Sequence, residues 1–381
     1  FRAWDAPRRL PGMRFFFDAR YIRTDFHDGI SRYTAGLGSA VQRLAPDEVT
    51  FLIHDERQLA HLPEGARWLL FQSNESPLEP IAALRLNKYR PDVLFSPLQT
   101  IGTAGRKYAA ILTLHDLIYY RHRKPPTNLN PLLRLGWRLY HLTYWPQRWA
   151  LNGADLVATV SNTSRREILE HRLTRNEVVV IPNAPQDLAA LLPEKAASDS
   201  PNATLRGRNL VYMGSFMPYK NVETLIRGMA QLPQHRLHLL SRIRDDRRRE
   251  LEALIPQGAQ VTFHNGVSDA EYARLLADDA ILVTGSLDEG YGLPIAEALE
   301  LGTPAVVSEL DIFHEVAGPG AKYFSATDPD AFATRVRELS HPDNYAATAA
   351  AGREHMRQYT WEHSARRLLH AARELHANRD R

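Results

Sequence analysis

Short apolar runs recur along the first half of the chain and alternate with stretches of helical periodicity. Between the first two runs, apolar residues repeat at the spacing of one helix face, at Ile30, Tyr33, Leu37, Val41 and Leu44. The runs themselves are residues 14–17, 49–53, 68–71, 93–96, 111–114, 156–160 and 178–181. This alternation predicts an α/β fold in which a buried parallel sheet is flanked by helices.

A second series of the same kind follows a stretch rich in Pro, Ser, Ala and charge, which is typical of a linker. Its apolar runs are residues 210–213, 237–241, 260–263, 280–284 and 304–308. We therefore predict two Rossmann-like domains, residues 13–185 and 207–358, joined by a linker at 186–206. Residues 359–381 are predicted to form a helix that docks back on the body. In such sheets ligands bind outside the carboxyl ends of the strands, so we expect the chemistry in an interdomain cleft.

Composition narrows the class of protein. The chain has 381 residues, no cysteine and a formal net charge of +3. Disulfides, thiolate metal sites and a cysteine nucleophile are excluded. The absence of cysteine suits a reducing compartment, so we predict a cytoplasmic protein. No apolar run has the roughly 18 residues of a membrane span, so the protein is expected to be soluble or peripheral, the peripheral position being at the inner face of the plasma membrane. Residues 1–12 precede the first strand-like pattern and are left out of the fold prediction as an upstream extension.

Several motifs have ordinary structural explanations. The run "RIRDDRRRE" at residues 242–250 alternates acids with bases, which is typical of a solvated helix face, and we expect no nucleic-acid partner. The one DxD sequence is "DPD" at 328–330, where an acid at a helix N-cap and Pro329 at the first helical position account for the pattern. No metal and no cofactor are expected.

A stretch of interleaved aromatic and basic residues runs from 117 to 151. It fits a membrane interface or a platform for sugars, and it equally fits ordinary helix packing. The residues that we predict on an acceptor or membrane side are Tyr119, Tyr120, Arg121, Arg123 and Trp137.

The segment "SLDEGYGLPIAEALELGTPAVVSEL" at residues 286–310 follows a predicted strand. Its Gly-rich turn leads to Pro294, which is well placed to start a helix, so backbone amides from Gly292 to Ile295 would form an anion site suited to a diphosphate. Glu289 lies before the turn, and Glu297 is expected in the first helical turn. Both carboxylates would face one cavity and accept hydrogen bonds from sugar hydroxyls.

A cation for the diphosphate is found in "YMGSFMPYKN" at residues 212–221. A predicted strand ends at Met213, a glycine turn follows, and Lys220 precedes a helical pattern. A lone lysine here is usually a surface residue, but its pairing with the acidic turn favours a site.

Taken together, these motifs resemble the retaining glycosyltransferases of family four, which have the two-domain GT-B fold. The resemblance rests mainly on the segment "EGYGLPIAE", which has seven residues between its glutamates and is followed by "ALELGTPAVVS". Further segments resemble the family in the same order, namely "DGISRY", "LHDL", "VSNTSRREI", "YMGSFMPYKN" and "FHNGVSDAEYARLLADDAILV". The resemblance covers residues 13 to about 375.

The resemblance implies a role for each matching residue. Glu289 would contact hydroxyls of the donor sugar, Glu297 would hold the ribose, and His115 would lie beside the anomeric carbon. Lys220 would neutralise the diphosphate, together with amides at Leu293 and the neighbours of Pro294. The positions implied to bind the donor are Gly29, Ser215, Lys220, Val267, Glu289, Gly292, Leu293, Pro294, Ile295 and Glu297.

The chain departs from the family pattern at two places. Many relatives have two adjacent glycines where this chain has Asp28 and Gly29, and many have an arginine where it has Ser215 or Tyr219. Only one phosphate cation is therefore assigned. The implied function is metal-independent transfer of a hexose, most simply mannose from GDP-mannose, to a lipid-linked or cell-envelope glycan, with an anionic membrane surface as a further partner. UDP-glucose or UDP-N-acetylglucosamine as donor, and a non-catalytic sugar-nucleotide-binding protein, are the alternatives.

Overall fold

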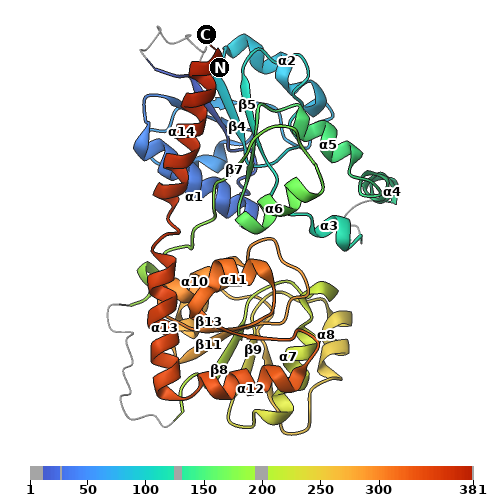
Figure 1. Cartoon of the computed structure of the whole chain (residues 1–381), viewed down its shortest axis with the longest axis vertical. Helices are drawn as coiled ribbons and strands as arrows, with labels where there is room; N and C mark the ends of the chain where they lie inside the picture. The colour runs from blue at the N-terminus through green and yellow to red at the C-terminus, as the bar shows by residue number, and fades with distance from the viewer. Residues whose placement is uncertain (1–11, 26–27, 124–130, 194–204, 380–381) are drawn as a thin grey trace. The chain divides into compact units, whose positions relative to one another are not determined.

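The computed structural model divides the chain into two compact units (Figure 1). Unit 1 contains residues up to Ala184 together with Thr360–Arg381, and unit 2 is Pro185–Tyr359. The structure describes residues 12–25, 28–123, 131–193 and 205–379. Residues 1–11 of the predicted extension and 194–204 of the predicted linker lie outside that part. In the described part of the linker, residues Ala189–Leu191 form a short 3-10 helix, η4.

Unit 1 is built on a parallel sheet of seven strands in the order β3-β2-β1-β4-β5-β6-β7. Every strand that the apolar runs predict is present, within two residues at either end. The strands are β1 (Phe15–Asp18), β2 (Val49–Ile53), β3 (Trp68–Leu70), β4 (Val93–Ser96), β5 (Ala109–Thr113), β6 (Leu156–Thr159) and β7 (Val178–Val180). Five of them are buried along their whole length, because helices cover both faces of a parallel sheet.

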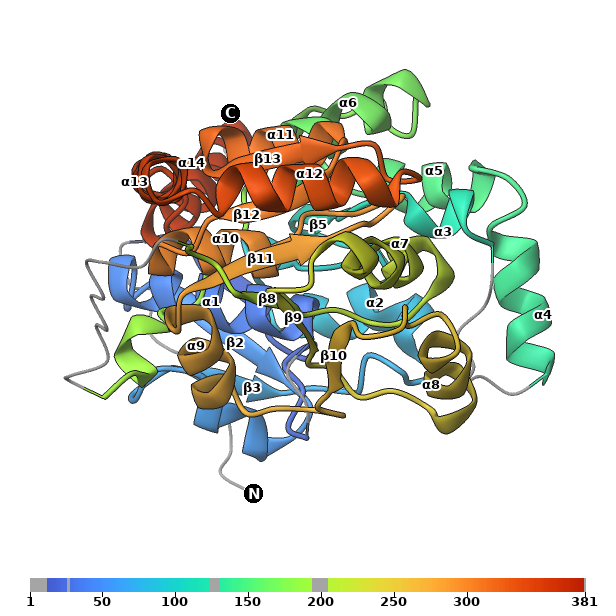
Figure 2. The same ribbon diagram turned by 90° about the horizontal axis from the view of Figure 1, so that it is seen from below.

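The helices of unit 1 follow the predicted alternation. They are α1 (Gly29–Leu44), η1 (Glu56–His61), η2 (Glu79–Ile81), α2 (Ala82–Leu86), η3 (Asn87–Tyr89), α3 (Ile118–Arg121), α4 (Pro131–Tyr140), α5 (Trp145–Asn152), α6 (Asn162–Glu170) and α14 (Trp361–Arg379). The apolar face of α1 is buried at Tyr33, Leu37 and Val41, as its periodicity predicts. In Figures 1 and 2, α4 stands at the outer edge of unit 1.

The C-terminal helix α14 packs against α1 within unit 1. Its buried side chains include the four small and apolar residues of the predicted face, Ala365, Leu368, Leu369 and Ala372. Gly36 on α1 allows the close approach, since a Cβ atom there would lie 2.4 Å from the Trp361 ring. This glycine therefore serves helix packing. The predicted docking of the helix is confirmed.

Unit 2 has a six-stranded parallel sheet in the order β10-β9-β8-β11-β12-β13. The strands are β8 (Asn209–Tyr212), β9 (Arg236–Leu239), β10 (Gln260–Phe263), β11 (Ala280–Thr284), β12 (Ala305–Ser308) and β13 (Ala321–Phe324). The strand β13 has no counterpart in the predicted runs. In both sheets the chain starts at a central strand, adds strands toward one edge, and then returns to add the remaining strands toward the other edge. This is the doubly wound order of Rossmann-like folds. The predicted fold class is therefore confirmed.

The remaining elements of unit 2 cover its sheet. They are η5 (Pro218–Lys220), α7 (Val222–Gly228), η6 (Met229–Gln231), α8 (Asp245–Glu252), α9 (Asp269–Ala277), α10 (Leu293–Leu301), α11 (Asp311–Ala317), η7 (Gly318–Gly320), α12 (Pro329–Leu339) and α13 (Pro342–Met356). At α12 the Asp328 carboxylate accepts hydrogen bonds from the amides of Asp330 and Ala331. The predicted N-cap explanation of "DPD" is confirmed. Within the described ranges, no helix is long and apolar enough to cross a membrane.

Candidate active site

The two central motifs of unit 2 meet where the strand order reverses. Strands β8 and β11 are adjacent, and the chain winds away from them in opposite directions. The loop after β8 carries Lys220, and the loop after β11 carries Glu289. Ligands of open α/β sheets bind at the carboxyl ends of strands at such a switch point. The fold therefore places both motifs at the most favourable position for a ligand in unit 2.

Lys220 and Glu289 form an ion pair across this switch point. Lys220 Nζ lies 2.5 Å from Glu289 Oε2, and the two side chains are 15% and 16% exposed. The Ser286 hydroxyl also donates to Glu289 Oε2, at 3.2 Å. The carboxylate is thus held on the side of the lysine, and an ammonium and a carboxylate are available together at one partly exposed position. A phosphate would bind the former and a hydroxyl the latter.

Asn221 connects the loops that carry this pair. Its φ of +49° is in the left-handed region, which asparagine tolerates better than most residues. Its Nδ2 donates to the carbonyls of Gly285 at 2.9 Å and Ala326 at 2.6 Å, and Thr224 donates to its Oδ1 at 3.0 Å. Asn221 therefore links the loops after β8, β11 and β13. Local sequence patterns do not reveal this role of Asn221, because its partners Gly285 and Ala326 lie 64 and 105 residues away.

Helix α10 begins one residue earlier than predicted. Gly292 is its N-cap with φ +95°, and Leu293 is the first helical residue. Glu297 consequently lies in the second turn, so its predicted position in the first turn is wrong. Its side chain is buried, at 3% exposure. Glycine is required at 292, because other residues rarely adopt this φ and a Cβ atom would lie 3.0 Å from Phe313.

The amide donors at the start of α10 are fewer than predicted. The Ile295 amide already donates to the Gly292 carbonyl at 2.9 Å, and Pro294 has no amide hydrogen. The amides of Gly292 and Leu293 are the donors that an anion could use. Together with the positive end of the helix dipole they favour a negative group next to Glu289.

Two other predicted donor residues lie at the same sheet edge. Ser215 is exposed after β8, and its carbonyl accepts a 2.6 Å hydrogen bond from the Tyr212 hydroxyl. Burial, with the nearby Glu289 charge, raises the pKa of Tyr212 far above its usual value, so this hydroxyl remains a donor. Val267 is half-buried after β10, directly behind Gly266, where φ is +105°. The Arg242 side chain lies against Gly266.

In unit 1, Gly29 is the exposed first residue of α1. The preceding Asp28 is the N-cap, and its carboxylate accepts from the Ser31 amide at 2.9 Å. It also pairs with Arg23, Nε to Oδ2 at 3.0 Å. Asp28 therefore supplies a side-chain cap for α1, which a glycine at this position would lack.

His115 follows strand β5 in unit 1. Its Nε2 donates to the Pro97 carbonyl at 2.8 Å, and its ring meets the edge of Tyr33 with centroids 5.0 Å apart. Burial lowers the pKa of His115 to about 4. At neutral pH the ring is therefore uncharged, and because Nε2 carries the hydrogen, Nδ1 is left as a hydrogen-bond acceptor.

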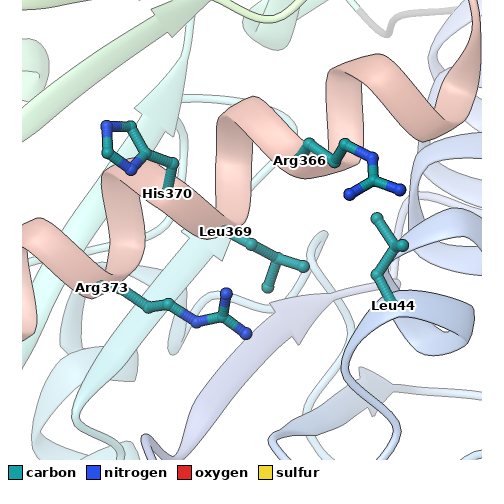
Figure 3. A pocket seen from close by; sticks show the side chains of 5 residues that line it. All are labelled: Leu44, Arg366, Leu369, His370 and Arg373. Carbon is teal, nitrogen blue, oxygen red and sulfur yellow. The ribbon is translucent and has the colours of Figure 1, made fainter.

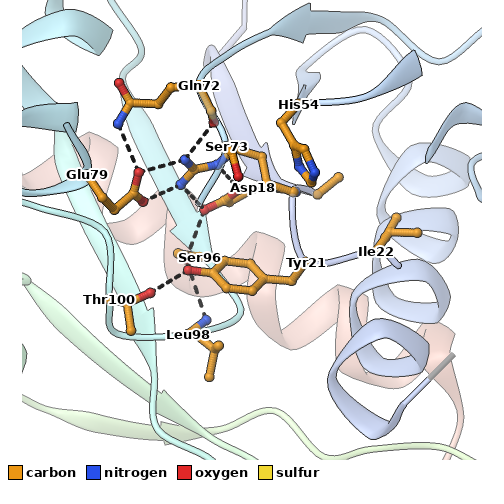
Figure 4. Close-up of polar contacts among 12 residues, drawn as sticks. Asp18, Tyr21, Ile22, His54, Gln72, Ser73, Glu79, Ser96, Leu98 and Thr100 are labelled. Atoms are coloured by element: carbon orange, nitrogen blue, oxygen red, sulfur yellow. Dashed lines mark hydrogen bonds and ion pairs between the residues drawn. The ribbon is translucent and has the colours of Figure 1, made fainter. Parts of the chain in front are cut away.

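The switch point of unit 1, between β1 and β4, holds a buried ionic cluster (Figure 4). Arg20 is 1% exposed and pairs with Asp18 at 2.8 Å and with Glu79 at 2.7 Å. Ser96 donates to Asp18 at 3.1 Å, and Gln72 donates to Glu79 at 3.0 Å. The cluster fixes the chain after β1 to the end of β4. The sequence reasoning missed it, because its members come from four separate segments.

Of the residues predicted on the acceptor or membrane side, Tyr120 is buried and the others are at least partly exposed. Tyr119 is 45% exposed, and its ring meets the half-buried Trp137 with centroids 5.4 Å apart. Arg121 pairs with Glu167 at 2.9 Å, and Arg123 donates to the Tyr120 carbonyl at 3.0 Å. Tyr120 itself is buried against Tyr144 and cannot offer its ring to an acceptor or a membrane, so its predicted place on the acceptor or membrane side is wrong.

Two further features do not contribute to the site. A hollow of about 300 Å³ lies in unit 1 between the end of α1 and α14, lined by Leu44, Arg366, Leu369, His370 and Arg373 (Figure 3). It faces the amino ends of the strands, since Arg373 pairs with Glu48 just before β2. Among the residues that the structure describes, no three His, Asp or Glu side chains gather as metal ligands would.

Two family models match the two halves of the chain. The model described as "Glycosyltransferase Family 4" matches residues 27–184, and the model described as "Glycosyl transferases group 1" matches residues 194–359. Both matches place the chain in the class of glycosyltransferases. The chain is a member of glycosyltransferase family four with the GT-B fold, as the motif resemblance predicts.

Individual relatives agree with this placement. The O-antigen chain mannosyltransferase B of Escherichia coli is 26% identical over 58% of this chain and 61% of its own length. The O-antigen chain mannosyltransferase RfbU of Salmonella typhimurium is 29% identical over 34% of this chain and 38% of its own length. The matched segments therefore span less than two thirds of either relative.

Solved structures show the same fold. The sucrose-phosphate synthase of Thermosynechococcus elongatus superimposes with a TM-score of 0.72 at 19% identity, covering 96% of this chain and 100% of that one. HepE of Anabaena in complex with UDP gives a TM-score of 0.70 at 16% identity, covering 95% and 100%.

Proposed function

We propose that the chain is a retaining glycosyltransferase that moves mannose from GDP-mannose to a lipid-linked or cell-envelope glycan. The observation that carries this proposal is the Lys220–Glu289 pair at the switch point of unit 2, next to the amino end of α10. The O-antigen mannosyltransferases among the relatives support mannose and a glycan acceptor. A cytoplasmic position at the inner face of the plasma membrane belongs to the same proposal.

The donor would bind along the carboxyl edge of unit 2. Lys220 and the amides of Gly292 and Leu293 would hold the diphosphate, and Glu289 would accept hydrogen bonds from hydroxyls of the mannose. Glu297 would hold the ribose, and the base would lie near Val267. The lysine and the glutamate, which neutralise each other in the structure, would then each contact a different part of the donor.

In the transfer, the bond between the anomeric carbon and the diphosphate oxygen breaks, and its electron pair remains on the diphosphate. The acceptor hydroxyl oxygen bonds to the same face of that carbon, and its proton passes to a phosphate oxygen of the leaving GDP. Charge grows on the diphosphate as the sugar becomes cationic, so fixed charges around both groups lower the barrier without a covalent nucleophile. Lys220 supplies the positive charge on the leaving-group side.

His115 would act as a neutral hydrogen-bonding group beside the reacting sugar. Its low pKa of about 4 keeps the ring uncharged at neutral pH. An uncharged ring does not repel the cationic sugar, and its Nδ1 can accept a hydrogen bond from a hydroxyl.

A UDP-sugar donor is the alternative that an observation favours, because HepE, a neighbour in fold, was solved with UDP. A non-catalytic sugar-nucleotide-binding protein is the other alternative, and the presence of Lys220, Glu289, Glu297 and His115 together argues against it.

A donor screen tests the proposal. The purified protein is incubated with GDP-mannose, UDP-glucose or UDP-N-acetylglucosamine and with octyl α-mannoside as a surrogate acceptor, and nucleoside diphosphate and product are measured. We expect GDP release with a product whose new linkage is α by NMR. A β linkage would contradict retention, turnover with a UDP-sugar alone would contradict mannose, and binding of donor without product in the presence of lipid-linked glycan extracts would favour the non-catalytic alternative.

A further inference from the structure

Unit 1 carries an exposed apolar surface on α4, α5 and the turn between them. We call it the tryptophan face. Its side chains are between 53% and 69% exposed: Leu135, Leu139, Leu142, Trp145 and Trp149. Single exposed apolar residues are ordinary on protein surfaces, but five within 15 residues, two of them tryptophan, mark a binding surface.

The helical spacing explains why these side chains are exposed together. Leu135 and Leu139 are four residues apart on α4, and Trp145 and Trp149 are four apart on α5. Residues four apart lie on one face of a helix. The opposite sides of the helices are anchored, because Tyr140 donates to Gln147 Oε1 at 3.1 Å and Leu151 is fully buried. The two helices therefore hold their apolar residues outward.

The sequence segment that carries the face has charged residues of one sign. Residues 117–152 contain six Arg or Lys and no Asp or Glu. Arg121 pairs with Glu167, and Arg148 donates to the carbonyls of His171 and Arg172. Arg134 and Arg138 lie on α4 beside the leucines, and within the described residues neither pairs with a carboxylate. Two arginines are thus available to a negatively charged partner.

We propose that the tryptophan face docks on an anionic lipid surface. Tryptophan and leucine beside arginine suit the boundary between acyl chains and headgroups, where the apolar parts insert and the cations meet lipid phosphates. The positive charge complements anionic lipid. It disfavours a second copy of the chain, because a symmetric contact would place like charges opposite each other. This docking rests on the proposed function, since it would bring the chain to a membrane that holds a lipid-linked acceptor. The proposed donor site lies in unit 2, so nucleotide binding can be tested separately from docking.

Vesicle flotation tests this docking with the full chain. Vesicles of phosphatidylcholine alone are compared with vesicles containing about one third phosphatidylglycerol. We expect binding to the anionic vesicles, which falls roughly tenfold or more in Trp145→Ala/Trp149→Ala. The affinity of Arg134→Gln/Arg138→Gln for the anionic vesicles should fall about fivefold for each arginine removed.

Matched variants and a spectroscopic readout make the test specific. Trp68→Ala removes another exposed tryptophan of unit 1, and Arg366→Gln/Arg373→Gln removes two exposed arginines from α14, so both should bind like the unchanged protein. Brominated lipids should quench the fluorescence of the unchanged protein and of Trp68→Ala, but not that of Trp145→Ala/Trp149→Ala.

Three results would overturn the proposal. They are the absence of anionic-vesicle binding, equal loss in the matched controls, and a concentration-dependent dimer in light scattering that Trp145→Ala/Trp149→Ala abolishes while vesicles remain unbound. The last result would assign the face to self-association. Nucleotide binding by each variant is measured in parallel, so failure of docking is distinguished from failure of the proposed transferase function.

Discussion

Lys220 Nζ and Glu289 Oε2 lie 2.5 Å apart although 69 residues separate them in the chain. The pair joins the loops after β8 and β11, the two central strands of unit 2. Both side chains remain partly exposed, so a ligand can reach them. When the donor binds, Lys220 would contact its diphosphate and Glu289 its sugar hydroxyls, in place of each other. The ion pair thus keeps both charges close to the positions where the transition state needs them.

Lys220→Ala and Glu289→Ala are expected to fold normally and to lose about 100- to 1000-fold in turnover, the usual effect of removing one preorganised electrostatic contact. Steady-state kinetics with GDP-mannose, together with circular dichroism, measure this. Lys88→Ala removes an exposed lysine of unit 1 and is the matched control. Turnover within threefold of the unchanged protein in either folded variant would remove that residue from the site.

Asn221 is expected to set the geometry of the lysine loop. Asn221→Gly keeps the left-handed backbone but leaves the carbonyls of Gly285 and Ala326 without their donor, so we expect a loss of about 1–3 kcal/mol in the free energy of unfolding of unit 2. Asn221→Ala should lose roughly 1 kcal/mol more, because alanine is strained at φ +49°. Urea unfolding measures both variants. Equal stability of the two would show that the backbone relaxes out of the left-handed region.

Arg20→Met should strongly destabilise unit 1. It leaves Asp18 and Glu79 buried without their cation, and breaking a buried pair in this way costs about 3–5 kcal/mol. Arg14→Met is the control, since Arg14 is half exposed and its pair with Asp92 should contribute no more than about 1 kcal/mol. Denaturant unfolding of unit 1 compares the stability of the two variants. A loss for Arg20→Met as small as that for Arg14→Met would mean that the cluster is hydrated.

Stability should decline as the pH falls from about 6.5 to about 4. Burial lowers the pKa of His115, His235 and His238 to about 4, whereas the unfolded chain takes up these protons near 6.5. In that window the unfolded state binds more protons than the folded state, so acid favours unfolding. Thermal unfolding from pH 7.5 to 4.5 checks this, and His238→Gln should flatten the decline. A melting temperature that is constant down to pH 4.5 would contradict the burial of these rings.

The sequence pattern predicted the two sheets and their helices well, because buried parallel strands leave dense apolar runs that periodicity detects. It missed β13, whose two central residues, Lys322 and Tyr323, are only half-buried and so leave no such run. It also started α10 one residue late, because proline is favoured at either of the first positions of a helix, and the true boundary depends on the φ of Gly292.

Contacts between distant segments could not be predicted from local patterns. The ion pair of Lys220 with Glu289, the three loops that Asn221 joins and the cluster around Arg20 all depend on which strands are neighbours. The aromatic stretch shows the same limit. Its composition fitted packing and exposure equally, and only the fold separates buried Tyr120 from exposed Trp145 and Trp149.

Calorimetric titration with GDP and with UDP, of the unchanged protein and of Lys220→Ala, tests the central claim most directly. The account predicts that GDP binds more tightly than UDP and that Lys220→Ala weakens GDP binding at least tenfold while the protein stays folded. Binding of neither nucleotide, or GDP binding that Lys220→Ala leaves unchanged, would contradict a nucleoside diphosphate site at the switch point between β8 and β11.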